Sequence, residues 1–297
     1  MNVKMIFRTL LKAQKPFRLI SLVMTYLLGA GFVQYVREMR SWPVFIQGGL
    51  FLLLIVLSLE YLVTLQRFVD PQQWPKAFTT RDVRQVRLIL AALSAALLTV
   101  ATSILISWMQ LGLMWQGLGF LLFALIVVGA FYFLSQVVER LRRLSLLVEV
   151  LLFIVIPPAV AFFLQSDSPH RLLTLVVVAL VPGYLAYRLL VQLKRFARDQ
   201  KFGIHTIVLD IGWENAMFYH NAFILLSYLL YAVIALFGFP WFIVWPVFLT
   251  LPIGLVEIWL IERVKRGASP QWKILQFATA CVLFLPLFLI GFAFWIR

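Results

Sequence analysis

The sequence has little charge, few acids and almost no cysteine. Charged residues make up 13% of its 297 residues and apolar residues 63%, whereas a typical globular domain has roughly 25% charged residues. This composition excludes a water-soluble domain and indicates that lipid is the solvent of this chain. Because Cys281 is the only cysteine, an intrachain disulfide and a cysteine-based metal cluster are also excluded.

The acids are outnumbered, with 12 Asp and Glu against 26 Lys and Arg. The basic residues lie mostly in short segments between apolar runs, so we interpret them as topology signals and lipid headgroup contacts and expect no nucleic-acid partner. No P-loop, G-x-G-x-x-G, G-x-S-x-G or Cys/His metal spacing occurs in the sequence. The common nucleotide-binding and hydrolase motifs are therefore absent.

What the sequence has in abundance is long apolar runs. A bilayer core about 30 Å thick needs roughly 20 apolar residues per helix. Nine runs approach or exceed this length, at 17–36, 43–65, 88–109, 113–134, 146–164, 172–190, 222–239, 241–261 and 274–296. Each is apolar on every face, which argues against the alternating segments of a membrane barrel. We predict an all-α, polytopic membrane helical bundle of about nine transmembrane helices, a single domain over residues 1–297, with an uncleaved first helix.

The basic residues predict the orientation. If successive connections alternate between the two sides of the membrane, one side holds 21 Lys and Arg and the other holds 4. By the positive-inside rule the N-terminus is cytoplasmic and the C-terminus is outside. The two longest connections, 66–87 and 191–221, then both face the cytoplasm, and long connections between packed helices are where we expect function.

The second of these connections carries a recognisable pattern. Residues 195–214, RFARDQKFGIHTIVLDIGWE, resemble the second aspartate-rich motif of the UbiA superfamily of intramembrane prenyltransferases, with matches at Asp199, Gly203, Thr206 and Gly212. Lys15-Pro16, just before the first predicted helix, is similar to the Arg/Lys-Pro that opens many members. The helix count, the cytoplasmic N-terminus and the two long connections agree with that family's architecture.

The resemblance implies a function and a cofactor. Members transfer an isoprenoid chain from a polyprenyl diphosphate to an aromatic or lipid acceptor, and two aspartate-rich motifs hold Mg²⁺ on the diphosphate. In this sequence Arg195 replaces the first carboxylate of the second motif, and the first motif, expected in 59–70, retains only Glu60 and Asp70. These departures predict weak Mg²⁺ binding, because a cation repels the ion and each motif lacks a carboxylate pair.

The candidate site residues follow from this comparison. Glu60 and Asp199 are the candidate metal ligands that remain. Four cations could hold a diphosphate directly, since guanidinium and ammonium groups bind phosphate without a metal: Arg67, Arg195, Arg198 and Lys201. The alternative interpretation of the cations is topology and anionic lipid contact. We also expect Arg195 and Asp199, four residues apart, to form an ion pair on one helix.

Three carboxylates lie inside apolar runs, where a charge is costly unless it is paired, hydrated or protonated. They are Glu60, Glu149 and Glu257. The structural interpretation pairs Glu149 with the basic cluster at 140–143 and Glu257 with a basic residue near the end of its helix. We expect His205 and His220 to be structural, since no metal-binding histidine spacing is present.

Two further functions are compatible with the sequence. One is a non-catalytic protein of the same fold that binds an isoprenoid, a lipid or a partner protein. The other is a secondary transporter, for which Pro and Gly interruptions of the runs would be the signal, but the two halves of the chain show no matching repeat.

Overall fold

The fold is all-helical within the described residues of the computed structural model. These residues are 16–36, 41–68, 79–113, 116–166, 170–201 and 206–296. Nine helical segments in this part of the chain are long and apolar enough to cross a membrane. Six of them are single helices that follow the predicted runs closely or extend beyond them: α2 (Pro16–Tyr35), α3 (Trp42–Arg67), α4 (Thr80–Gln110), α5 (Gln116–Val137), α8 (Arg171–Leu193) and α14 (Trp272–Ile296). The chain is therefore an integral membrane protein of the predicted helical class.

The other three segments complete the bundle. The fifth is built from η2 (Glu139–Leu144), α6 (Ser145–Val150), η3 (Leu151–Val155) and α7 (Ile156–Phe163). The seventh is α11 (Trp213–Leu236), and the eighth joins α12 (Trp241–Val244), η4 (Trp245–Thr250) and α13 (Leu251–Lys265). Two short helices, α9 (Phe196–Lys201) and α10 (Ile207–Ile211), lie between α8 and α11.

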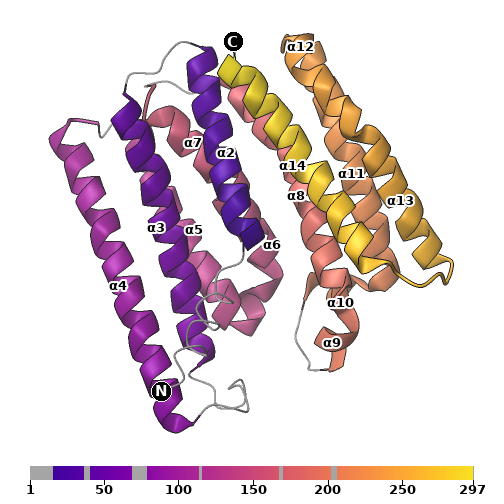
Figure 1. Ribbon diagram of the computed structural model, residues 1–297, viewed down its shortest axis with the longest axis horizontal. Coiled ribbons are helices and arrows are strands. Elements are labelled where there is room, and N and C mark those ends of the chain that lie inside the picture. Colours follow the sequence, from indigo (N-terminus) through magenta and orange to yellow (C-terminus); the bar gives the residue numbers. More distant parts are fainter. Residues whose placement is uncertain are drawn as a thin grey trace.

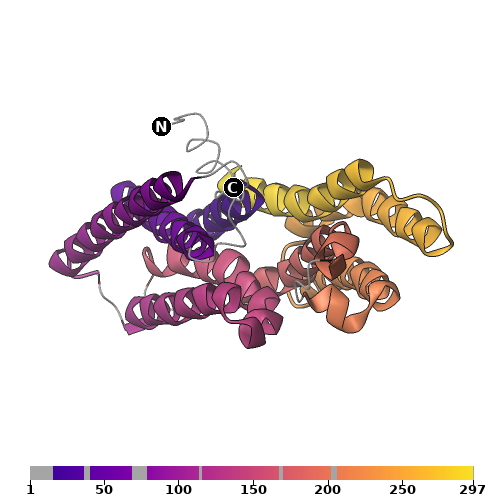
Figure 2. The same cartoon turned by 90° about the horizontal axis from the view of Figure 1, so that it is seen from below.

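The bundle has two parts that meet along α2 and α14. Helices α2–α7 form one part and α8–α14 the other, with α2 and α14 packed side by side at the boundary (Figures 1 and 2). The C-terminal end of α3, the start of α4, and the short helices α9 and α10 all lie at the lower end in Figure 1. The described parts of the two connections predicted to face the cytoplasm are therefore at the same end of the molecule.

Helices α4 and α11 begin well before the apolar runs predict. Helix α4 starts at Thr80 because Thr79 and Asp82 form a capping box: the Thr79 hydroxyl accepts from the Asp82 amide at 3.2 Å, and the Asp82 carboxylate accepts from the Thr79 amide at 3.1 Å. Helix α11 starts at Trp213, after Gly212 turns the chain with φ +86°. Part of each predicted connection is thus helical.

The fifth span bends where two prolines interrupt it. Pro157 and Pro158 have no amide hydrogen, so the Phe153 carbonyl loses its donor four residues ahead, and residues 151–155 form a π-helix. The Thr25 hydroxyl of α2 donates to this carbonyl at 2.9 Å. Close approach of the two helices is possible because α2 has Gly29 opposite Pro158, where an added Cβ would lie 2.4 Å from the Pro158 carbonyl oxygen.

Candidate functional site

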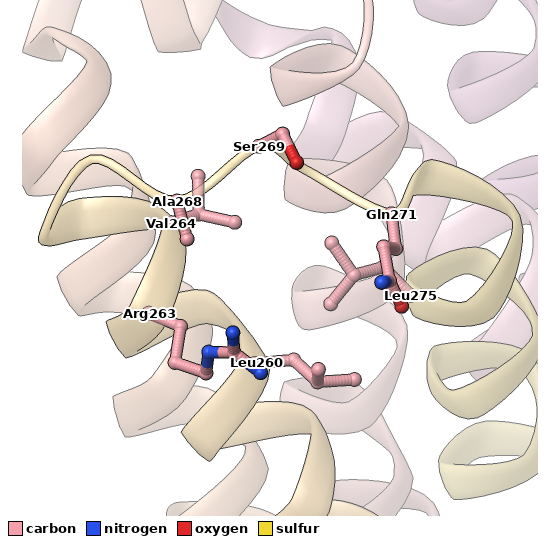
Figure 3. Close-up of a pocket in the computed structure, with 7 residues that line it drawn as sticks. All are labelled: Leu260, Arg263, Val264, Ala268, Ser269, Gln271 and Leu275. Atoms are coloured by element: carbon pink, nitrogen blue, oxygen red, sulfur yellow. The ribbon is translucent and has the colours of Figure 1, made fainter.

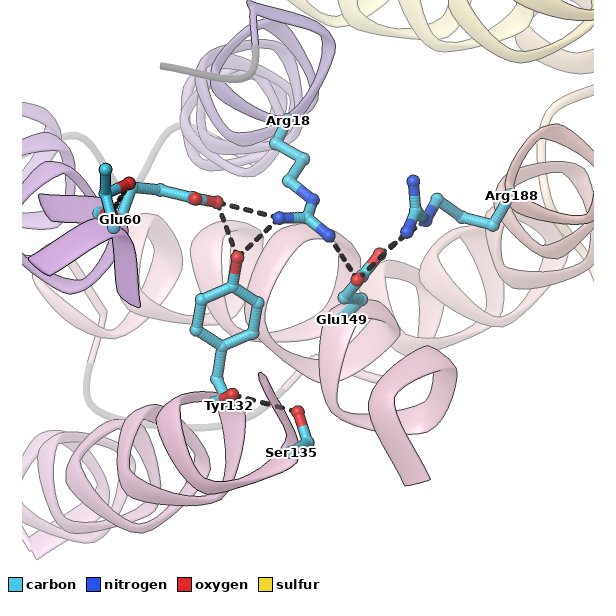
Figure 4. Close-up of polar contacts among 7 residues, drawn as sticks. Arg18, Glu60, Tyr132, Ser135, Glu149 and Arg188 are labelled. Carbon is cyan, nitrogen blue, oxygen red and sulfur yellow. Dashed lines mark hydrogen bonds and ion pairs between the residues drawn. The ribbon is translucent and has the colours of Figure 1, made fainter. Parts of the chain in front are cut away.

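A network of charged side chains lies inside the bundle, and Arg18 of α2 is at its centre (Figure 4). Its side chain is 6% exposed. One guanidinium nitrogen, Nη1, donates to Glu60 of α3 at 2.8 Å and to the Tyr132 hydroxyl of α5 at 2.5 Å. The Tyr132 hydroxyl in turn donates to the same Glu60 oxygen at 2.5 Å. Glu60 is therefore held by a cation and a phenol from two other helices.

Glu149 of α6 extends this network to the second part of the bundle. Its carboxylate accepts from Nη2 of Arg18 and from Nη2 of Arg188 on α8, the latter at 3.0 Å, and its other oxygen lies 2.5 Å from Nε of Arg188. The predicted partner of Glu149, the basic cluster at 140–143, was wrong. Within the described part of that cluster, Arg143 pairs with Asp210 at 3.1 Å.

The charges that the described residues contribute to this buried network balance. Arg18 and Arg188 supply two positive charges and Glu60 and Glu149 two negative ones, alternating from α3 to α8. Such balance is required, because an unpaired charge inside a protein within a membrane costs several kcal/mol. The Arg18 guanidinium also lies 5.4 Å from the centroid of the Tyr132 ring, within range of a cation–π contact.

The second candidate metal ligand, Asp199, lies in α9 and is 4% exposed. Its partner is the neighbouring Arg198, whose Nε and Nη2 donate to one carboxylate oxygen at 3.2 and 2.9 Å. The predicted ion pair between Arg195 and Asp199 was therefore wrong: the shorter reach from the adjacent residue prevails over the helical i, i+4 spacing. Only a backbone bond links Arg195 to Asp199, its carbonyl accepting from the Asp199 amide at 2.9 Å.

Arg195 is an exposed cation beside other cations. It lies between α8 and α9, outside the apolar span, and no ion pair is described for it. Partial burial lowers the pKa of Arg195, and the positive charges of Arg198, Arg188 and Arg18 lower it further, against a smaller opposite effect of Asp199. This end of α8 has a surplus of positive charge.

Some of the remaining candidate site residues lie in the described part of the structure and others do not. Lys201 is exposed at the end of α9, with no described ion pair. The side chain of Arg67 lies outside the described part of the structure, as do Asp70, Gly203 and His205. Of the matched motif positions, Thr206 caps α10 by accepting from the Leu209 amide at 3.3 Å, and Gly212 supplies the positive-φ turn into α11.

Mg²⁺, the cofactor that the resemblance implies, does not fit these carboxylates as they are placed. Glu60 Oε1 already accepts from Arg18 and Tyr132, and Asp199 Oδ1 from Arg198. A divalent ion bound to these two oxygens would have to displace their donors. Among the described residues, no three His, Cys, Asp or Glu side chains come together as a group able to hold a metal ion.

A second buried polar cluster lies in the C-terminal part of the bundle. Glu257 of α13 and His220 of α11 are both fully buried and in contact, with 3.0 Å between His220 Nε2 and Glu257 Oε1. The Thr279 hydroxyl of α14 donates to the same oxygen. The expectation that Glu257 pairs with a basic residue near its helix end was wrong, while His220 has a contact that fits its expected structural role.

Sequence reasoning missed Arg18, Tyr132 and Arg188 as site residues. Arg18 was counted as a topology signal and Arg188 was noted only as lying near the cytoplasmic end of its helix, although both lie inside helices long and apolar enough to span the membrane. An intramembrane arginine is a candidate functional residue for the same reason as an intramembrane carboxylate. The sequence therefore contained a usable signal: two arginines and two glutamates within apolar runs, which could have been predicted to pair with one another.

These features define a polytopic helical membrane protein with a buried Arg–Glu network in its core. No protein-family profile matches the chain, and no curated protein matches it. Among solved structures it is similar to the apo structure of a UbiA homolog from Aeropyrum pernix K1, with 17% identity, a TM-score of 0.48, and 92% of this chain and 96% of that chain covered. At this identity and TM-score the similarity carries no argument about function.

Proposed function

We propose that this protein is a membrane-embedded prenyltransferase of the kind that residues 195–214 resemble, and that it binds the diphosphate of a polyprenyl donor with side-chain cations instead of Mg²⁺. The binding residues are Arg195, Arg198 and Lys201 at the cytoplasmic end of α8 and in α9. The isoprenoid chain would lie among the apolar helices. The acceptor would be an aromatic or lipid molecule that also partitions into the membrane.

The observation that carries this proposal is the surplus positive charge at the end of α8. The pKa of Arg195 is lowered by burial and by the charges of Arg198 and Arg188, so a bound anion would relieve that repulsion. Diphosphate is a suitable anion, since guanidinium groups bind phosphate oxygens in bidentate fashion. The same cations would stabilise the negative charge that develops on the leaving diphosphate.

The proposed absence of Mg²⁺ follows from the pairing of the carboxylates. Glu60 is paired with Arg18 and Asp199 with Arg198, so each carboxylate charge is already partly neutralised and attracts a divalent ion less strongly. Turnover should then survive chelation.

The test is prenyl transfer from a radiolabelled polyprenyl diphosphate to a panel of quinone precursors and lipids, with the protein in vesicles and with either Mg²⁺ or EDTA. We expect product under both conditions. Product that EDTA abolishes would show that the site assembles a metal cluster. Binding of the diphosphate without product on any acceptor would support the alternative, a non-catalytic isoprenoid-binding protein.

Three variants examine the cations. Arg195→Gln should weaken diphosphate binding by tenfold or more, since a hydrogen bond to a charged group contributes about 1.5–3 kcal/mol. Arg81→Gln removes an exposed cation from the start of α4 and should leave binding unchanged. Arg195→Asp should make binding dependent on Mg²⁺, because it places a carboxylate four residues before Asp199. Equal effects of the Gln variants would contradict the proposed site.

A further inference from the structure

A shallow pocket lies at the turn between α13 and α14, away from the Arg–Glu network (Figure 3). Arg263, Ser269 and Gln271 supply its polar side chains, and Leu260 and Leu275 are among its apolar lining. The pocket therefore has a charged, hydrogen-bonding side and a hydrocarbon side. No role in the proposed prenyl transfer uses these residues.

The turn that forms one wall is fixed by its own backbone. Gly267, with φ +94°, ends α13 in a Schellman motif. The Ala268 amide donates to the Arg263 carbonyl at 3.0 Å and the Gly267 amide to the Val264 carbonyl at 3.0 Å. The last carbonyls of α13 are thus partly satisfied within the chain, and Ser269 is held on a defined turn.

The charge around the pocket is strongly positive. Four exposed cations lie on the last turn of α13, the turn itself and the first turn of α14, and none has a described ion pair: Arg263, Lys265, Arg266 and Lys273. The acid on the same stretch, Glu262, accepts a hydrogen bond from Asn221 of α11 at 3.1 Å. Of these cations Arg263 lines the pocket, and the other three add positive charge to the surface around the turn.

The surface next to the pocket has the exposed aromatic and apolar side chains that are typical of membrane helices near the water interface. Trp259, 56% exposed, lies under the Arg263 guanidinium, which is 4.9 Å from its ring centroid, and tryptophan is typical of the headgroup region. On α14, Ile274 and Phe277 are 51% and 73% exposed. An apolar chain leaving the pocket would therefore find exposed hydrocarbon on the neighbouring helix.

We infer that this pocket binds the headgroup of an anionic phospholipid. The phosphate would contact the Arg263 guanidinium, the glycerol and headgroup hydroxyls would hydrogen-bond Ser269 and Gln271, and the acyl chains would lie against the lipid-facing side of α13 and α14. Basic pockets between membrane helices bind anionic headgroups by this combination of charge and apolar contact. A zwitterionic lipid offers the same phosphate with a cation attached, which Arg263 in the pocket lining disfavours.

The test is native mass spectrometry of the full chain in detergent, titrated with phosphatidylglycerol, phosphatidylcholine or inorganic phosphate. Arg263→Gln is compared with Lys265→Gln, which removes an equal charge from the same helix but not from the pocket lining. We expect preferential retention of phosphatidylglycerol by the parent, a loss of about tenfold in Arg263→Gln, as for one charge-assisted hydrogen bond, and a change within about twofold in Lys265→Gln.

Ser269→Glu provides an independent variant, because an acid on the turn should repel the headgroup, and thermal unfolding checks that each variant is folded. Equal losses in Arg263→Gln and Lys265→Gln would indicate diffuse surface attraction and overturn the inference. Retention of phosphatidylcholine equal to that of phosphatidylglycerol would also overturn it, since the pocket would then be merely apolar. Displacement of the lipid by millimolar phosphate would identify a free-anion site instead.

Discussion

Arg18 lies near the start of the first described helix and forms ion pairs with carboxylates of two other helices. Arg18 pairs with Glu60 and with Glu149, and Glu149 also pairs with Arg188. Along this path, which runs from α3 through α2 and α6 to α8, the charges alternate in sign. Removing one member of a buried pair leaves the other uncompensated, which typically costs about 3–5 kcal/mol. The network therefore constrains how the two parts of the bundle meet.

This alternation predicts the effect of Glu149→Gln. The variant leaves Arg18 with Glu60 and leaves Arg188 without a charge partner, so we expect a loss of about 3–5 kcal/mol and a lower apparent Tm in detergent. The control is Asp210→Asn, which removes the partner of Arg143. Arg143 is 76% exposed, so that change should have little effect.

The double variant Glu149→Gln/Arg188→Gln separates charge balance from packing. It keeps Arg18 and Glu60 as a neutral pair and removes the orphaned guanidinium, so it should be more stable than Glu149→Gln alone. A double variant as unstable as the sum of the two single variants would show that these residues are not coupled.

For single residues, the sequence indicated which carboxylates need partners but not which residues those partners are. Glu60, Glu149 and Glu257 were all identified as intramembrane acids, and the described structure buries each of them. Their partners come from helices far apart in the chain: Arg18 is 42 residues from Glu60 and 131 from Glu149. Local spacing, which led to the basic cluster at 140–143 and to Arg195 with Asp199, cannot indicate contacts of this range.

Single helices were the most predictable elements, because each has an apolar run of bilayer length. Their ends were less predictable. Helix α4 extends eight residues before its apolar run through polar residues that a capping box holds in place, and hydropathy has no information about caps. The π-helix in the fifth span was signalled only by Pro157 and Pro158, and the Thr25 hydroxyl that donates to its Phe153 carbonyl comes from another helix.

The contact between α2 and α7 depends on the absence of a side chain at Gly29. A Cβ there would meet the backbone of Pro158, with its oxygen at 2.4 Å and Cα at 2.5 Å, and backbone cannot yield as a flexible side chain can. Gly29→Ala should therefore destabilise the protein by about 1–3 kcal/mol, measured as a lower apparent Tm. Gly119→Ala, on α5 with nothing within 4 Å of the added Cβ, is the matched control and should be neutral or slightly stabilising. Similar behaviour of the two variants would exclude this close packing.

For the whole molecule, composition and apolar runs were sufficient to predict the helical class, while the orientation in the membrane stays a prediction. The structure has α9, α10 and the start of α4 at one end, with the turn between α13 and α14 on the same side (Figure 1). The ends of α4 and α11 lie at the opposite end (Figure 1). Relative sidedness thus follows from the fold, whereas which end is cytoplasmic follows only from the distribution of Lys and Arg.

Single cysteines test both statements, in a parent in which Cys281 is replaced by Ala. Cysteines at Thr80, Gln200 and Ser269, all exposed at the basic end, should react with a membrane-impermeant maleimide only when the cytoplasmic face is accessible. Cysteines at Leu111 and Leu236, 63% and 85% exposed, should react from the outer face. Permeabilised membranes, in which all five should react, control for accessibility. The expected direction comes from the 21 to 4 bias in basic residues. Reaction of Gln200→Cys and Thr80→Cys from different faces would contradict the arrangement of the bundle, whereas reaction of both from the outer face would reverse the orientation and place the proposed diphosphate site outside the cytoplasm.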